Sequence, residues 1–147
     1  MKTTVTNTLI REYRPEDFPS LLELWQKTDL TQPERGDSEE IIERCSELGG
    51  ELLVMEDTGS GIIIGSSWMT WDGRRIYLHH FGILPEFQGM GLGTELAEKS
   101  LEWIRQKGQQ VKLEVHKENH AAKHLYEKLG FFAFRDYDIY MIREFET

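Results

Sequence analysis

The sequence predicts an α/β domain, on three observations. Segments with apolar residues at alternate positions, typical of strands, are interleaved with segments in which apolar residues recur every three or four positions, typical of amphipathic helices. A glycine-rich turn, Gln88 to Gly93, joins a strand-like run to one of the helical patterns. The length of 147 residues suffices for one sizeable core but not for two, so we expect residues 1–147 to form a single domain.

The first half of the chain is expected to contain one strand, two helices and a hairpin. In order, these are a strand at Thr8–Tyr13, a helix opened by Pro15, a loop at Leu30–Asp37, a helix at Ser38–Leu48, and the strands Glu51–Glu56 and Ile62–Trp71. The last two strands are joined by a short turn containing glycine, which predicts that they pair as a hairpin.

In the second half of the chain, the expected strands and helices alternate more regularly. Its expected elements are a strand at Arg75–Leu84, a helix at Thr94–Lys107, a strand at Val111–Val115, a helix at Asn119–Leu129, and strands at Phe131–Phe134 and Tyr137–Ile142. Arg75–Leu84 is rich in apolar and aromatic residues, which suits a central strand covered on both faces. Gly108 and Gly130 are placed to end the two helices.

The net charge of −9 is concentrated near the N-terminus, where residues 12–51 contain twelve acidic side chains and four basic ones. An acidic surface disfavours nucleic acid as a partner. It favours a cationic small-molecule amine as a ligand, although acidic surfaces commonly serve solubility alone. Both interpretations stay open at the level of sequence.

The chain carries no signal for a membrane or for export. No apolar run approaches the roughly 20 residues of a membrane span, and the polar segment Met1–Thr8 lacks the apolar core of a secretory signal. We therefore expect a cytoplasmic protein. Cys45 is the single cysteine, which excludes an internal disulfide and a cysteine-based metal site, and we expect no metal. Its acidic neighbours disfavour the thiolate, and its spacing fits a buried helix face.

The turn from Gln88 to Gly93 has the character of a diphosphate-binding loop. Glycines at alternate positions let backbone N–H groups turn inward, and the helix that follows adds its unpaired first-turn donors. Glycines also occur in such turns for steric reasons alone. A dinucleotide-binding loop is a weaker alternative, because Thr94 stands where its third glycine would be and Glu114 falls inside the next strand rather than after it.

A second motif follows about thirty residues later, where Asn119 opens a helix that contains Tyr126 and stops at Gly130-Phe131. The two motifs, Q-x-x-G-x-G and N-x-x-A-x-x-x-Y-x-x-x-G-F, resemble those of the GNAT superfamily of acetyl-CoA-dependent N-acetyltransferases. The resemblance is strong over residues 75–134 and weak before them. It implies a mixed, mostly antiparallel sheet of about seven strands, flanked by about four helices.

The resemblance implies which residues bind acetyl-CoA. The diphosphate contacts fall on Gln88, Gly89, Met90, Gly91, Leu92, Gly93 and Thr94. The backbone around Ile83 would pair with the pantetheine arm, as a peptide adds to a sheet edge. Asn119 has two expected roles, as the N-cap of its helix and as a contact to the pantetheine amide. Lys123 is a further candidate for a phosphate of the coenzyme, although a solvated lysine is the simpler interpretation.

Acid and base are expected from two further positions. Tyr126 matches the tyrosine that many members use as an acid toward the departing thiolate, although ordinary helix packing would also suit it. For the base we favour His79 over His80, because strand side chains alternate and His79 should share its face with Tyr77, Phe81 and Ile83. A purely structural role for both histidines is the competing interpretation.

Together these expectations describe an N-acetyltransferase that transfers acetyl to a primary amine directly, in a ternary complex. A sensor that holds acyl-CoA without chemistry is the alternative. The residues that would line the acceptor site fall where the resemblance is weakest, so the sequence leaves the acceptor open. The aromatic C-terminal strands, which would otherwise present an apolar edge, predict a homodimer.

Overall fold

The computed structural model describes residues 7–31 and 35–145, whose contacts group into two units, one up to Leu113 and one from Glu114 onward. Each unit has its own secondary structure. The loop predicted at Leu30–Asp37 and the polar segment at Met1–Thr8 fall partly outside the described residues.

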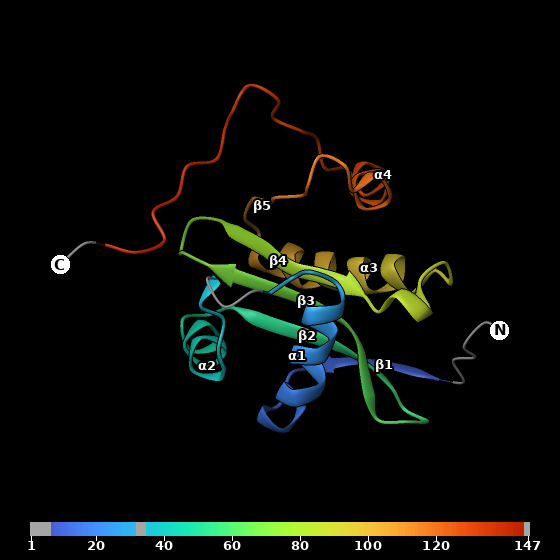
Figure 1. Cartoon of the computed structure of the whole chain (residues 1–147). Helices are drawn as coiled ribbons and strands as arrows, with labels where there is room; N and C mark the ends of the chain where they lie inside the picture. Colours follow the sequence, from blue (N-terminus) through green and yellow to red (C-terminus); the bar gives the residue numbers. More distant parts are fainter. Residues whose placement is uncertain (1–6, 32–34, 146–147) are drawn as a thin grey trace. The chain divides into compact units, whose positions relative to one another are not determined.

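A five-stranded sheet organises the first unit (Figure 1). Its strands are adjacent in chain order: β1 (Thr8–Glu12), β2 (Glu51–Asp57), β3 (Ile62–Trp71), β4 (Ile76–Ile83) and β5 (Val111–Leu113). Strands β1 to β4 pair antiparallel, which confirms the β2–β3 hairpin, whereas β5 lies parallel to β4. The α/β class and the mixed, mostly antiparallel sheet are confirmed, but the described residues form five strands rather than about seven.

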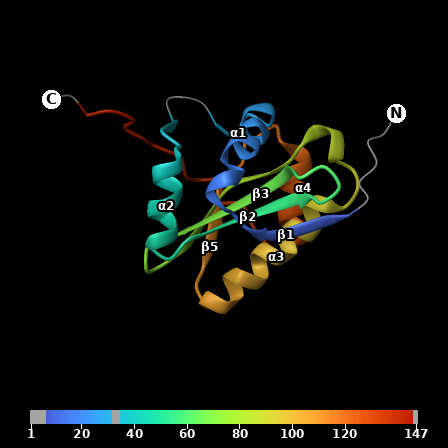
Figure 2. The same ribbon diagram turned by 90° about the horizontal axis from the view of Figure 1, so that it is seen from below.

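Helices cover both faces of this sheet, with α1 (Phe18–Lys27) and α2 (Glu39–Glu47) on one face and α3 (Leu92–Lys107) on the other (Figure 2). The indole of Trp25 in α1 stacks on that of Trp68 in β3, with ring centroids 5.7 Å apart. The adjacent Ser67 instead meets Ser100 of α3, with 2.6 Å between the two Oγ atoms. Because successive strand residues point to opposite faces, these contacts assign α1 and α3 to opposite sides.

The helix ends follow the capping chemistry of the sequence. The Ser38 hydroxyl accepts the backbone N–H of Ile41 at 3.2 Å and caps α2. Gly108, at a φ of +69°, ends α3. Helix α3 begins at Leu92, two residues before the predicted start at Thr94, with Gly91 as its N-cap. Among the described residues, no helix combines the length and the apolar character needed to cross a membrane.

Part of the acidic excess is neutralised inside the fold. The guanidinium of Arg11 in β1 donates to both carboxylate oxygens of Asp17, at 2.8 and 2.9 Å, and to Glu56 of β2 at 2.8 Å. The hydrogen bonds from Arg11 hold the pKa of Asp17 below its usual range, although burial acts in the opposite direction. This carboxylate is therefore committed to the sheet rather than to a ligand.

Strand β4 carries a bulge at its centre. Trp68 pairs with His79 and Ser66 pairs with Gly82, so β4 has one residue more than β3 between these pairs. His80 lies in this interval with a φ of +46°, a value that residues other than glycine rarely adopt. The bulge changes which side chains of β4 share a face.

The second unit contains α4 (His120–Lys128) and an irregular C-terminal segment. Asn119 caps α4, as predicted, by accepting the backbone N–H of Ala122 at 3.2 Å. The strands predicted at Phe131–Phe134 and Tyr137–Ile142 are wrong, because residues 131–145 form no strand. Alternating aromatic residues favour a strand only where a neighbour supplies ladder hydrogen bonds and side-chain contacts. Side chains along this segment are largely exposed, so the homodimer stays a prediction.

Candidate functional site

Both histidines of β4 lie on the face of the sheet that α1 covers. The ring of His79 lies 6.2 Å from the indole of Trp68, and the ring of His80 lies 5.2 Å from the same indole, centroid to centroid. The expectation that only one of them points to this face is wrong, because it assumed strict alternation and the bulge interrupts it. Ile83 pairs with Gly65, three positions from Trp68 in β3, and so points to the opposite face from His79.

His79 is held as a neutral imidazole. Its Nε2 lies 2.8 Å from Oγ1 of Thr70, and its ring stacks on Tyr77 with centroids 4.2 Å apart. Burial lowers the pKa of His79 from 6.5 to about 4, and the charge of the neighbouring His80 adds to the effect. A histidine with a pKa of about 4 is a weak proton acceptor near pH 7.

His80 forms a hydrogen-bonded pair with Asp37, with 2.8 Å between Nε2 and Oδ2 and both side chains 12% exposed. Burial acts to raise the pKa of Asp37, but the hydrogen bond and charge of His80 outweigh it, and the net pKa is lowered. Asp37 is therefore a carboxylate at neutral pH, so Nε2 of His80 donates to it. A carboxylate in this position orients the imidazole and stabilises the imidazolium that forms when Nδ1 takes a proton.

The surroundings of His80 fix its unusual backbone. The Ser66 hydroxyl donates to the carbonyl oxygen of His80 at 2.6 Å and accepts the indole N–H of Trp25 at 2.9 Å. The Trp25 ring also lies 4.5 Å from the His80 ring. Residues held at a positive φ by such contacts occur preferentially at functional sites. No pattern in the sequence predicts the contact between His80 and Asp37, which are 43 positions apart.

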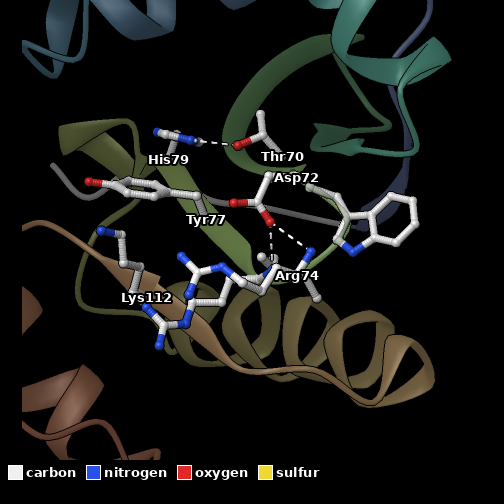
Figure 3. Close-up of a pocket in the computed structure, with 9 residues that line it drawn as sticks. Thr70, Asp72, Arg74, Tyr77, His79 and Lys112 are labelled. Atoms are coloured by element: carbon white, nitrogen blue, oxygen red, sulfur yellow. Dashed lines mark hydrogen bonds between the residues drawn. The ribbon is translucent and has the colours of Figure 1, made fainter.

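A pocket of about 390 Å³ opens beside His79 (Figure 3). It is lined by Thr70, Trp71, Asp72, Arg74, Arg75, Ile76, Tyr77, His79 and Lys112. Figure 3 shows the rings of Tyr77 and His79 side by side, with Lys112 beside Tyr77. The pocket therefore joins one of the two histidines to a group of cationic side chains. Sequence reasoning did not identify Asp37, Thr70 or these cations, although Tyr77 was expected on the face of His79.

The glycine turn opens into free space at the start of α3. Gly89 and Gly91 have φ values of +81° and +80°, and a Cβ atom built on either would meet nothing within 4 Å. The first backbone hydrogen bond of α3 runs from the N–H of Glu95 to the carbonyl of Gly91, at 3.2 Å. The N–H groups before Glu95 are thus the unpaired donors of a helix start, where a diphosphate binds. These residues fit the pyrophosphate of a coenzyme.

The side chain of Gln88 ties the turn to β4. Its Nε2 donates to the carbonyl oxygen of Ile83 at 2.9 Å, while the Ile83 side chain is buried. Ile83 can therefore meet a ligand only through its backbone, as the resemblance implies. Met90 is exposed and Leu92, Gly93 and Thr94 are partly buried, at the mouth of the turn and in the first turn of α3.

Replacing Gly91 with alanine should raise the KM for acetyl-CoA about 10-fold, because the new Cβ would occupy the open space in the turn. Alanine at a positive φ also costs about 1 kcal/mol of unfolding free energy. Gly108→Ala is a matched control, since Gly108 caps the other end of α3 at a φ of +69° and is equally open. Both variants should lose similar stability in denaturant, and only Gly91→Ala should change the KM. If the two variants had the same KM for acetyl-CoA, the turn would not be part of the coenzyme site.

Tyr126 lies in the second unit, on α4. It is buried and packs edge-to-face against Phe131, with ring centroids 5.6 Å apart. Burial raises the pKa of Tyr126 to about 12. The phenol is therefore protonated at neutral pH and available as a proton donor. Asn119 precedes the same helix, whereas His79, Ile83 and residues 88–94 all belong to the first unit.

The carboxylates, histidines and cysteine of the described residues do not cluster in a way that would hold a metal ion, since no group of three or more is found there.

The chain was compared with known families and solved structures. Residues 9–131 match the model of the acetyltransferase (GNAT) family. An acetyltransferase from Trypanosoma brucei superposes with a TM-score of 0.74 at 23% identity, covering 92% of this chain and 100% of that one. Glucosamine-6-phosphate N-acetyltransferase from Arabidopsis thaliana gives 0.74 at 20% identity, covering 95% and 99%. The PaiA N-acetyltransferase from Thermoplasma acidophilum, solved with coenzyme A, gives 0.71 at 22%, covering 90% and 94%. The glycine turn, the bulged strand and the family match agree, and the chain belongs to the GNAT family of acetyltransferases.

Proposed function

We propose that this protein transfers the acetyl group of acetyl-CoA directly to a primary amine in a ternary complex. The observation that carries the proposal is the presence, in one unit, of the open glycine turn at the start of α3 and of His80 on the strand β4 before it, where the carboxylate of Asp37, from the segment before α2, pairs with His80. Acetyltransferases of this family use acetyl-CoA. A cytoplasmic location and a small-molecule acceptor are part of the same proposal.

The residues that fit acetyl-CoA have distinct tasks. The backbone N–H groups of the turn Gln88–Thr94 hold the diphosphate through the start of α3. The backbone at Ile83 pairs with the pantetheine arm, and Asn119 supplies an amide contact to it. Bound acetyl-CoA supplies the thioester carbonyl that the amine attacks. Stability of the loaded protein should rise with acetyl-CoA concentration, as it does for any ligand that binds only the folded state.

The base must take a proton from an ammonium group whose pKa in water is near 10. Of the two histidines, the geometry supports His80 better than His79. The His79 ring is buried against Tyr77 and Thr70 and its pKa of about 4 makes it a poor acceptor. His80 keeps Nδ1 as acceptor, and its partner Asp37 stabilises the imidazolium that results. In this proposal His79 shapes the site and His80 takes the proton.

Tyr126 is the proposed acid. As the amine nitrogen bonds to the acetyl carbon, the carbon–sulfur bond breaks and the sulfur leaves as a thiolate. The phenol of Tyr126 gives its proton to that thiolate, and His80 holds the proton taken from the amine. An ammonium acceptor loses two protons in becoming an amide. One balances the proton that Tyr126 gives to the sulfur, and the other passes through His80 to the solvent, so the reaction releases one proton overall.

The test is coenzyme A thiol release from acetyl-CoA by the purified protein across a panel of amines, amino acids, aminoglycosides, polyamines and N-terminal peptides. Release above hydrolysis with one class would establish the enzyme and identify its acceptor. Acetyl-CoA binding with no release on the whole panel would favour the alternative, a sensor of the same fold. Affinity for NAD instead of coenzyme A in a competition titration would contradict both.

A further inference from the structure

The pocket beside His79 is positively charged, in a protein whose net charge is −9. Its lining includes the cations Arg74, Arg75 and Lys112 and one carboxylate, Asp72. The carboxylate is engaged locally, because one of its oxygens accepts the backbone N–H groups of Arg74 and Arg75 at 2.8 and 2.7 Å. None of the acidic residues that the structure describes between positions 12 and 51 lines this pocket.

Contacts position two of the three cations, Arg75 and Lys112, without neutralising them. Nε of Arg75 donates to the side-chain oxygen of Gln110 at 3.1 Å, which orients the guanidinium. Nζ of Lys112 lies 5.1 Å from the centroid of the Tyr77 ring, a cation–π contact that steadies the ammonium without cancelling its charge. Across residues 7–31 and 35–145, no ion pair engages Arg74, Arg75 or Lys112.

The same pocket reaches the catalytic strand. Tyr77 and His79 form one wall, and the ring of His79 lies 6.4 Å from that of His80, centroid to centroid. A ligand held by the cations would therefore lie beside His79, the neighbour of the proposed base. Planar guanidinium groups match the oxygens of carboxylates and phosphates in two-point contacts, and a lysine adds a point charge.

We propose that this pocket is the acceptor site and that Arg74, Arg75 and Lys112 bind an anionic group, a carboxylate or a phosphate, on the amine that is acetylated. The inference rests on the proposed acetyl transfer and identifies its substrate class. It is an alternative to the cationic acceptor expected from the acidic excess, because no described carboxylate of residues 12–51 lines the pocket. Asp17, for example, is bound to Arg11, and Asp37 is bound to His80.

Matched amines test the charge of the acceptor. Thiol release should be measured at low salt with O-phosphoethanolamine against ethanolamine, glycine against glycinamide, and putrescine as a cationic amine. The member of each pair that carries a phosphate or a carboxylate should have a kcat/KM at least 10-fold higher than the partner that lacks it, with putrescine lowest. Equal values within the pairs, or a preference for putrescine, would overturn the inference while leaving acetyl transfer established.

Two double variants test the residues. Arg75→Gln with Lys112→Gln should lower kcat/KM for the preferred anionic amine roughly 10- to 100-fold, mainly through KM. Ethanolamine and acetyl-CoA should keep their KM values within about twofold. The control is Lys99→Gln with Arg105→Gln, which removes the same charge from exposed positions of α3. A loss in the control equal to that in the pocket variant would show a general effect of net charge and would overturn the inference.

Calorimetry with O-phosphoethanolamine and glycine, in the absence of acetyl-CoA, separates the pocket from the reaction. If these amines bind to the unmodified protein and to the control variant but not to the pocket variant, the anionic site is supported. If no thiol release is found in that case, only the proposed acetyl transfer is contradicted. If thiol is released with other amines while no anionic amine binds or reacts, the anionic acceptor site is contradicted and the acetyl transfer is established. If neither binding of these amines nor thiol release is found, both the anionic acceptor site and the acetyl transfer are contradicted.

Discussion

Replacing Tyr126 with phenylalanine should lower turnover by about 10²-fold or more while leaving the affinity for acetyl-CoA nearly intact. The side chain is buried and its ring packs against Phe131, and phenylalanine keeps that packing. Only the hydroxyl proton is lost. The variant therefore removes the proposed acid without opening a cavity, and the comparison of kcat with the dissociation constant of acetyl-CoA isolates the chemical role.

The pH dependence gives a second measure of the same role. Because the pKa of Tyr126 is raised to about 12, the phenol stays protonated from acidic pH up to about pH 10. Turnover should show no alkaline decline due to this group below about pH 10. Tyr137→Phe, an exposed tyrosine of the same unit, is the control and should change nothing. Unchanged turnover in Tyr126→Phe would remove this residue from the mechanism.

The parts of the fold that could be predicted are those fixed by local pattern. The β2–β3 hairpin, the end of α3 at Gly108 and the cap of α4 at Asn119 each depend on a few neighbouring residues, and each is confirmed. The C-terminal strands could not be predicted in this way. A strand depends on a partner that supplies hydrogen bonds, and the aromatic pattern of residues 131–142 says nothing about whether one is present.

The candidate site also combines features that neighbouring residues determine with features that depend on distant parts of the fold. The glycine turn was identifiable because its positive φ values require glycine at fixed positions. The bulge at His80 was not, since alternation is the default for a strand and a bulge leaves no mark in a single sequence. Asp37 was missed because it reaches His80 through the tertiary fold, from a segment without a recognisable pattern. The acidic excess could be treated only as a surface, because no sequence pattern shows that the fold directs individual carboxylates to Arg11 and His80.

Exchanging His80 for asparagine should lower kcat by about 10²- to 10³-fold at pH 7, whereas His79→Asn should cost less than about 10-fold. Asparagine suits the test because it tolerates the positive φ of position 80 better than most residues and cannot act as a base. Asp37→Asn should fall between the two, since it removes the charge that stabilises the imidazolium but leaves the ring in place. Near-ultraviolet circular dichroism of the Trp25–Trp68 stack checks that each variant is folded.

The deficit of His80→Asn should shrink as the pH rises toward 10. An acceptor amine with a pKa near 10 then loses its proton to water and no longer needs a base. The kcat of the variant should therefore approach that of the unmodified protein. A variant that was merely misfolded would lose activity at every pH by the same factor. The opposite ranking, with the large and pH-dependent loss in His79→Asn, would transfer the role of base to His79. It would also mean that binding of the amine, or water in the pocket, raises the pKa of that histidine well above the value of about 4 that burial imposes.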